Sequence, residues 1–234
     1  IGFGLLLILA LLVTVQDGVA TTVNYVASTG YSTSVQGPRW YYEYGTPGAG
    51  SPMTFNSTVG RWTKPGVSYP YVTATTEHPS TSGGDALRRF VVPQSGSVLV
   101  SGTATRTSAS GDGVRVKIFQ NQAERWSATL APAQSASHAV AFAVQAGDSI
   151  TFEVAALSTQ TSDSTTWNPT VALTTIALNQ APVAEAGLDQ VGQLSTAFVF
   201  DGTGSSDPEG SPLTYSWAYG DGTSGVGVAP SHSY

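Results

Sequence analysis

The sequence predicts a mainly β chain in three parts, and three observations lead to that prediction. An uncharged apolar run opens the chain and predicts a hydrophobic N-terminal α-helix over residues 1–29. Short runs rich in Val, Thr and aromatic residues then follow, separated by turn residues roughly every eight to twelve positions. They predict a β-sandwich domain over residues 30–178. A linker beginning at Asn179 opens a third part, a smaller domain over residues 179–234.

The apolar run explains the predicted helix. Ile1–Val15 carries no charge, and at 1.5 Å per residue it reaches only about 22 Å, short of the roughly 30 Å hydrocarbon core of a membrane. Beyond Val15, apolar residues recur at Val19, Val23 and Val26, close to one helical face, and Gly30 is a suitable helix stop. A helix that is apolar all round has to be buried, so we expect a partner that covers it.

The start of the chain resembles archaellins and type IV pilins, because Ile1-Gly2 precedes the apolar run Leu5–Val13 with no initiator Met and no basic leader. In those families a peptidase removes the leader and keeps the apolar stretch. The acidic residue that bacterial pilins carry at the fifth position is absent, since Leu5 stands there. The resemblance implies a homopolymeric filament, in the membrane only before assembly. Its helical core would contain Ile1, Phe3, Leu5, Leu6, Leu7, Ile8, Leu9, Leu11, Leu12, Val13, Val15, Val19, Val23 and Val26.

Two other interpretations of this run stay open. It is also compatible with an uncleaved secretory signal peptide, because Gly18-Val19-Ala20 resembles a signal peptidase site. It is compatible as well with the stub of an ordinary membrane anchor.

The composition favours an extracellular protein and argues against nucleic acid as a partner. Charged residues make up 10% of the chain, against roughly 25% in typical soluble domains. There is no cysteine, so disulfides and thiolate metal sites are excluded. The net charge is −6, the only lysines are Lys64 and Lys117, and Arg88-Arg89 is the sole basic pair. Binding to a phosphate backbone needs clustered Lys and Arg.

The middle part is all-β, with about nine strands. Alternation is clearest where Val114, Val116 and Ile118 are separated by Arg115 and Lys117. The predicted strands are Trp40–Tyr44, Tyr69–Thr75, Leu87–Val92, Ser97–Thr105, Val114–Gln120, Arg125–Leu130, Ala139–Val144, Ser149–Ala155 and Thr170–Leu178.

Residues of about 36–175 are similar to jelly-roll modules attached to secreted bacterial proteins, some of which bind carbohydrate. The similarity rests on Trp40–Tyr44, His78-Pro79, Arg88–Pro93, Gly111–Ile118 with Trp126, Gly147–Phe152 and Asp163–Pro169.

The C-terminal part resembles a PKD (polycystic-kidney-disease-type) domain, an immunoglobulin-like β-sandwich. Five motifs occur in the family's order: Asn179–Asp189, Phe198–Gly202, Gly204–Gly210, Leu213–Gly222 and Pro230–Tyr234. Ala218 departs from the pattern, which usually has Asp there. The chain stops before the family's last strands, so we expect this domain to be incomplete and the native protein to continue. The resemblance implies an extracellular spacer or interaction module without chemistry of its own.

Aromatic residues supply a candidate glycan-binding platform. Alternation places Trp40, Tyr42 and Tyr44 on one face of a strand with Glu43 nearby, and Trp62 is a further candidate. Flat aromatic faces flanked by carboxylates suit the apolar side of a pyranose. The interpretation that we favour is that this face belongs to the core or to a subunit contact. We also expect Trp126 and Trp167 to be core residues.

No catalytic residue is predicted, and the chain is not expected to be an enzyme. The histidines His78, His138 and His232 lie in unrelated contexts, and no nucleophile turn motif is present. Paired carboxylates such as Asp85 with Glu77, or Asp148 with Glu153, resemble ordinary turn and surface acids, although two carboxylates are what glycoside hydrolysis requires.

No cofactor is expected apart from Ca²⁺, for which Asp201, Asp207 and Asp221, with Glu209, are weak candidate ligands. The same residues suit turns by themselves. Asn56-Ser57-Thr58 is a candidate N-glycosylation site.

Three functional classes follow. The first is a structural subunit of an extracellular filament, whose partners are copies of itself. The alternative is a secreted or membrane-anchored adhesin or carbohydrate-binding protein at the cell surface, whose partners are surface glycans or other cells. A third is an accessory region of a longer hydrolase.

Overall fold

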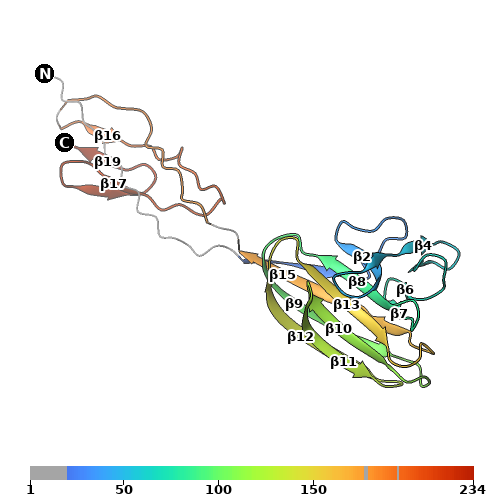
Figure 1. Ribbon diagram of the computed structural model, residues 1–234. Coiled ribbons are helices and arrows are strands. Elements are labelled where there is room, and N and C mark those ends of the chain that lie inside the picture. Colours follow the sequence, from blue (N-terminus) through green and yellow to red (C-terminus); the bar gives the residue numbers. More distant parts are fainter. Residues whose placement is uncertain (1–19, 177–178, 194) are drawn as a thin grey trace. The chain divides into compact units, whose positions relative to one another are not determined.

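The computed structural model describes residues 20–176, 179–193 and 195–234, and every regular element within these ranges is a β-strand (Figure 1). No helix in these ranges is long and apolar enough to cross a membrane. The chain forms two compact units, a larger one over Ala20–Ile176 and a smaller one that includes Ala177–Tyr234. We call them the sandwich unit and the C-terminal unit.

The sandwich unit consists of two sheets. The nine-stranded sheet contains, in order, β1 (Ala20–Val26), β15 (Thr170–Ile176), β9 (Gly96–Arg106), β14 (Thr165–Trp167), β7 (Thr76–His78), β6 (Tyr71–Val72), β5 (Arg61–Thr63) and β4 (Thr54–Asn56), and β12 (Ser135–Val144) also pairs with β9. The six-stranded sheet contains β11 (Ala123–Leu130), β10 (Val114–Gln120), β13 (Ser149–Ala156), β8 (Asp85–Val91), β2 (Trp40–Gly45) and β3 (Ser51–Pro52).

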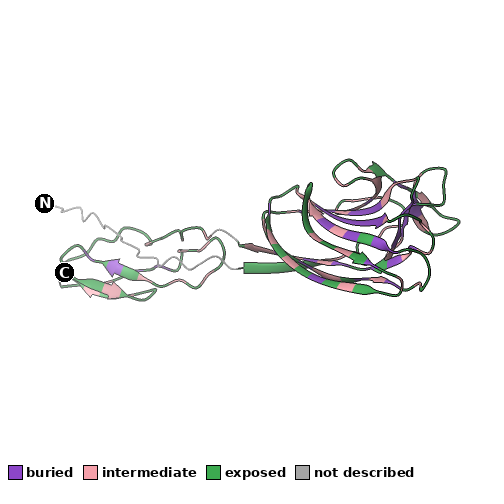
Figure 2. Ribbon diagram, turned by 60° about the horizontal axis from the view of Figure 1, so that its bottom comes forward, coloured by how far each residue is buried: buried purple, intermediate pink, exposed green. Residues whose placement is uncertain are grey.

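The core lies between the sheets and follows the period-two alternation of the sequence. On β10, Val114, Val116 and Ile118 are fully buried, whereas Arg115 is exposed. Two of their partners across the ladder on β13 are buried as well, Val154 opposite Val116 and Phe152 opposite Ile118. Figure 2 shows these buried positions along the strands of the sandwich unit. Burying this continuous apolar layer is what holds the two sheets face to face.

The predicted N-terminal helix is wrong where the structure describes it. Ala20–Val26 is strand β1, and it pairs antiparallel with β15 from Ala20 opposite Ile176 to Val26 opposite Thr170. The valine spacing fits a helical face, but this segment is rich in β-branched residues and carries Tyr25, which packs against the core. Residues 1–19 lie outside the described residues. Within the ranges that are described, the fold class is all-β.

Several strands differ in extent from the prediction. The segment predicted as Tyr69–Thr75 contains only the two-residue strand β6, because Pro70 has no N–H to donate to a ladder. Five short strands were not predicted, β3, β4, β5, β7 and β14, and neither was β1. The long strands β9, β10, β12 and β13 were predicted to within a few residues.

The C-terminal unit is built from two short ladders. β16 (Ala197–Val199) pairs with β19 (Ser231–Ser233), and β17 (Ser216–Ala218) pairs with β18 (Ser224–Val226). Phe200, Trp217 and Tyr219 form its small core. The Trp217 indole N–H donates to the Gly227 carbonyl at 2.8 Å, which satisfies its one polar atom.

Candidate functional site

The aromatic residues assigned to a glycan platform are packed into the core. Trp40, Tyr42 and Trp62 expose only 3%, 1% and 5% of their surface, and the Tyr42 ring stacks on Trp62 with centroids 5.4 Å apart. Tyr44 is half-buried and packs against the same cluster, with the Lys64 ammonium 5.1 Å from its ring. The three residues of β2 do share a face, but it is the face that the other sheet covers. These residues therefore form no open platform.

The outer face of β4–β7 carries a different group of side chains. On β5, Trp62 packs into the core, so Arg61 and Thr63 lie on the opposite, outer face. The antiparallel register extends that face across the sheet, with Thr63 opposite Tyr71 and Tyr71 opposite His78. We define the Tyr69 site as this outer face together with the loop beside it, namely Thr54, Asn56, Arg61, Thr63, Gly66–Tyr69, Tyr71 and His78.

Three aromatic rings form the base of the Tyr69 site. The centroid of the Tyr69 ring lies 4.4 Å from that of His78, and the Tyr71 ring stacks on His78 at 5.3 Å. Tyr71 is fixed at its far end, because its hydroxyl hydrogen-bonds to Ser164 Oγ at 2.9 Å. Tyr69 is the outermost of the three and exposes 37% of its surface. Tyr69 is thus the most solvent-exposed residue of this stack, and His78 supports its ring.

Burial disfavours the charged form of the histidine in this stack. It lowers the pKa of His78, and the charge of Arg61 lowers it further. The Nδ1–H of His78 donates to the Pro79 carbonyl at 2.7 Å, which fixes the ring beneath Tyr69 and Tyr71.

Arg61 supplies the positive charge of the Tyr69 site. Its guanidinium carbon lies 4.0 Å from the centroid of Tyr71 and 5.8 Å from that of Tyr69, so the group stacks on one ring and borders the other. Its Nη2 donates to the Ser68 carbonyl over a long 3.4 Å. Among the residues that the structure describes, Arg61 has no carboxylate partner within 4.0 Å.

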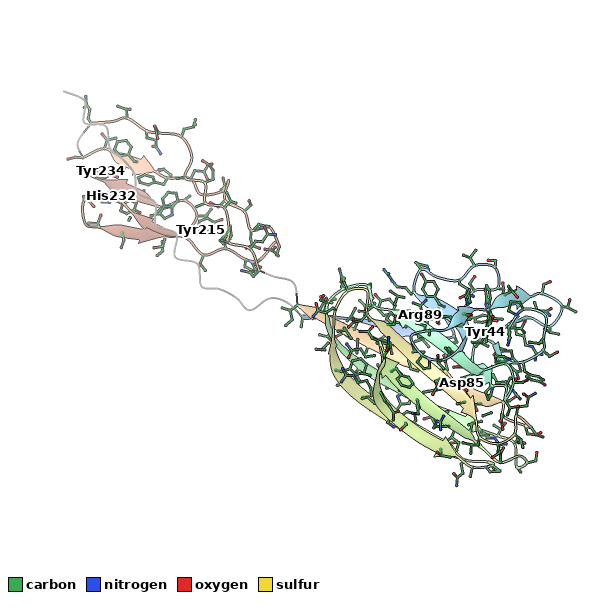
Figure 3. All side chains as sticks on the ribbon, viewed as in Figure 1. Tyr44, Asp85, Arg89, Tyr215, His232 and Tyr234 are labelled. Carbon is green, nitrogen blue, oxygen red and sulfur yellow. The ribbon has the colours of Figure 1, made fainter. Side chains whose placement is uncertain are left out.

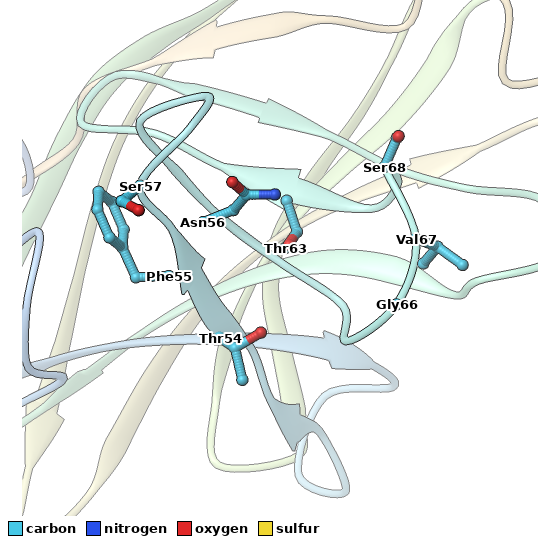
Figure 4. A pocket seen from close by; sticks show the side chains of 8 residues that line it. All are labelled: Thr54, Phe55, Asn56, Ser57, Thr63, Gly66, Val67 and Ser68. Atoms are coloured by element: carbon cyan, nitrogen blue, oxygen red, sulfur yellow. The ribbon is translucent and has the colours of Figure 1, made fainter.

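A polar pocket of about 500 Å³ adjoins the aromatic base. It lies between the edge strand β4 and the 66–68 loop, with Thr63 at its floor (Figure 4). Ser68 joins the two parts of the site, because it lines the pocket while its carbonyl accepts from Arg61. The lining residues are Thr54, Phe55, Asn56, Ser57, Thr63, Gly66, Val67 and Ser68, which offer hydroxyl and amide groups and no carboxylate.

Asn56, the candidate N-glycosylation residue, is exposed at the rim of this pocket. Its side-chain oxygen accepts from the Thr58 backbone N–H at 3.1 Å, as in an Asx turn. Whether it carries a glycan stays a prediction.

The carboxylates combine differently from the pairs considered in the sequence. Asp85 on β8 lies close enough to Glu153 on β13 for the two carboxyl groups to affect each other's pKa (Figure 3 labels Asp85). Glu77 is fully buried beside Arg88, with 3.8 Å between Oε1 and Nη2. Asp148 stabilises a turn by accepting from Gln145 N and Gln120 Nε2. None of these groups borders the pocket.

Burial and the neighbouring Asp85 carboxylate raise the pKa of Glu153 to about 7. A folded-state pKa above the unfolded value means that the native state holds the proton more tightly, so this group's contribution to stability falls as pH rises from about 4.5 to 7. Glu153→Gln removes that loss. We therefore expect the melting temperature of Glu153→Gln, relative to wild type, to be higher at pH 8 than at pH 5.

The matched control is Glu124→Gln, since Glu124 is exposed and its hydrogen bond from Lys117 lowers its pKa. That variant should show no relative gain at pH 8. Equal differences for Glu153→Gln at both pH values would show that the pKa of Glu153 is not raised in the native state.

The C-terminal unit is held by an aromatic and polar arrangement at its last strand. The His232 ring lies parallel to Tyr219 at a centroid distance of 4.2 Å, and its Nε2 bonds to Asp221 Oδ2 at 2.8 Å (Figure 3 labels His232 and Tyr234). The Tyr234 hydroxyl donates to the Tyr219 carbonyl at 3.0 Å. The aromatic-Gly-Asp-Gly turn and the final His-Ser-Tyr segment therefore pack against each other, and both belong to the motifs quoted from the sequence. Residues 179–234 match the PKD domain family. This confirms the resemblance of the C-terminal part.

In the C-terminal unit, each of the three candidate calcium ligands accepts hydrogen bonds within its own turn. Asp201 Oδ1 accepts from the backbone and hydroxyl of Thr203, and Asp221 Oδ1 accepts in the same way from Thr223. Asp207 Oδ1 accepts from Glu209 N and Ser211 N. Within the described ranges, no three metal-binding side chains are gathered in one place.

Apart from the match of residues 179–234, similarity to known proteins is low. No curated protein matches the chain. One solved structure, an isomalto-dextranase from Arthrobacter globiformis T6 complexed with panose, aligns at 10% identity with a TM-score of 0.30 and covers 67% of this chain and 32% of that one. Dimeric latent PorU from Porphyromonas gingivalis aligns at 10% identity with a TM-score of 0.30, and the alignment covers 74% of this chain and 16% of that one. The chain thus spans a third or less of either protein, and we base no argument about ligands on them.

The residues predicted for helix-core assembly divide into two groups. The members of that set from Ile1 to Val19 lie outside the described residues. Val23 and Val26 are on β1, where Val23 is 46% exposed and Val26 is opposite Thr170. Both therefore belong to a sheet and not to a helical bundle.

Proposed function

We propose that this protein is a secreted or surface-attached adhesin that binds carbohydrate through the Tyr69 site. The observation that carries the proposal is the exposed Tyr69 ring, which is held by a ring stack beside a pocket of hydroxyl and amide groups. A flat aromatic face with a few fixed polar groups is the combination that receives a sugar ring. The PKD match supports an extracellular location, since PKD domains typically occur in extracellular or surface proteins.

The proposed activity is binding without catalysis. Glycoside hydrolysis normally uses two carboxyl groups on either side of the scissile bond. The Tyr69 site contains none, and the carboxylate of Glu77, which lies on the adjacent position of β7, is buried on the core side beside Arg88. We rank binding by the sandwich unit ahead of filament assembly, because the described part of the predicted helix, Ala20–Val26, is strand β1.

Tyr69→Ala tests the proposal directly. Aromatic stacking contributes about 0.5–1.5 kcal/mol beyond the area it buries, and 1.4 kcal/mol is a factor of ten, so affinity for a bound glycan should fall by up to about tenfold. We would screen the chain, made in a host without N-glycosylation so that Asn56 stays unmodified, on a glycan array. Each hit would then be measured by titration calorimetry.

Tyr41→Ala is the matched control. Tyr41 also lies beside an arginine, with Arg89 4.4 Å from its ring, but on the six-stranded sheet. The control should bind like wild type. If no glycan binds, or if both substitutions weaken binding equally, the Tyr69 site is not a carbohydrate site.

A further inference from the structure

The charge distribution around the Tyr69 site bears on the class of glycan that it would hold. The protein as a whole is acidic, with a net charge of −6. The Tyr69 site is different, because it contains the cationic Arg61 and no carboxylate, and burial lowers the pKa of His78. A locally positive site on an acidic protein selects for a ligand that supplies the missing negative charge.

The arginine is held in place and partly unused. The Tyr71 ring, whose centroid is 4.0 Å from the guanidinium carbon, supports the guanidinium group from one side. Nη2 makes only the long bond to Ser68, and Nη1 has no hydrogen-bond partner in the described part of the chain and is not among its buried atoms. Two adjacent N–H groups of a fixed guanidinium match the two oxygens of a carboxylate. In an ion-paired arginine this position is filled, as in Arg89, whose Nη2 lies 2.7 Å from Glu43 Oε1.

The carboxylate and the sugar ring would be received side by side. Arg61 lies 5.8 Å from the centre of the exposed Tyr69 ring, and its hydrogen bond to the Ser68 carbonyl links it to a residue that lines the pocket. A pyranose stacked on Tyr69 would therefore lie next to the Arg61 guanidinium, where a carboxylate on the sugar ring would pair with it.

We infer that the Tyr69 site binds acidic glycans, specifically polysaccharides built from uronic acids. This rests on the proposed function and narrows it from carbohydrate in general to carboxylate-bearing sugars. Arg61 is the residue that confers the preference, and Tyr69 supplies the stacking face common to any sugar.

The test compares polygalacturonate with the same polymer after methyl esterification, which removes the charge and keeps the sugar. Dextran and glucomannan serve as neutral probes. Titration calorimetry on the full chain should show at least about tenfold tighter binding to the free acid, weakening as salt is raised. Arg61→Gln should remove the preference, and Arg61→Lys should restore it in part, because a lysine keeps the charge and loses the planar fork.

Arg125→Gln is the control for overall charge, since Arg125 also stacks on an aromatic ring, 5.2 Å from the centre of Phe142, on the β11 edge. It should bind like wild type. Tyr69-dependent binding of neutral and esterified polymers with no gain for the acid would overturn this inference and leave the proposed function standing. Absence of any Tyr69-dependent binding to either set would overturn both.

Discussion

Replacing Arg106 by methionine should destabilise the sandwich unit by about 3–5 kcal/mol, the usual cost of leaving a buried charge without its partner. Arg106 and Asp163 have fully buried side chains, with Nη2 and Oδ1 3.3 Å apart. The same guanidinium donates to the carbonyls of Ser108, Ser110 and Thr161. It therefore joins two loops at one end of the unit. Urea denaturation followed by far-ultraviolet circular dichroism would measure the loss.

Two further variants make this prediction sharper. Arg125→Met removes an exposed arginine and should change the free energy of unfolding by no more than about 0.5 kcal/mol. Burial already raises the pKa of Asp163 to about 6, so Asp163→Asn added to Arg106→Met should recover part of the loss by removing the orphaned carboxylate. If Arg106→Met costs no more than Arg125→Met, the pair does not hold the loops.

Trp167→Ala should cost about 3–5 kcal/mol, because it opens a cavity in the centre of the core. Trp167 is fully buried, and its ring meets Phe152 edge to face with centroids 5.3 Å apart. Its indole N–H donates to His138 Nε2 at 2.9 Å, and His138 in turn bonds through Nδ1 to the Val100 carbonyl. The substitution therefore loses apolar contacts and a buried hydrogen bond together. The same denaturation experiment reports the change.

The control for Trp167 is Trp126→Ala. Trp126 is half-buried on β11 and packs against His138 from the outer end of the cluster, with centroids 5.0 Å apart. The Trp126 side chain already faces solvent in part, so truncating it should reduce the free energy of unfolding clearly less than truncating Trp167. Equal losses in the free energy of unfolding would contradict a central position of Trp167 in the core.

The long strands could be predicted from the sequence because their alternation extends over many residues. Val114, Val116 and Ile118 identify both the strand and its buried face. The helix prediction failed at Ala20–Val26 because the valine spacing was given more weight than the β-branched content. Pairing with β15, some 150 residues further along the chain, decides that segment, and no local pattern shows it.

The candidate site was missed for a related reason. β4–β7 are two or three residues long, so alternation cannot show which face of each strand is outside. Arg61 and Trp62 are neighbours in sequence but lie on opposite faces of β5. The predicted glycan platform included Trp62, which faces the core, and not Arg61. The available signal was the combination of Tyr69, Tyr71 and His78 in one short stretch. Which of these rings is exposed depends on the register of four strands, which only the structure gives.

The pairing of β1 with β15 also has a mechanical consequence. Ala20 and Ile176, where the chain enters and leaves the sandwich unit, are opposite each other at one end of an antiparallel ladder. A tensile load applied through these two points would peel the strands apart like a zipper, breaking the cross-strand bonds in succession instead of shearing them all at once. Under traction, the unit should therefore yield first at this seam, at low force, while the interior around Trp167 remains intact.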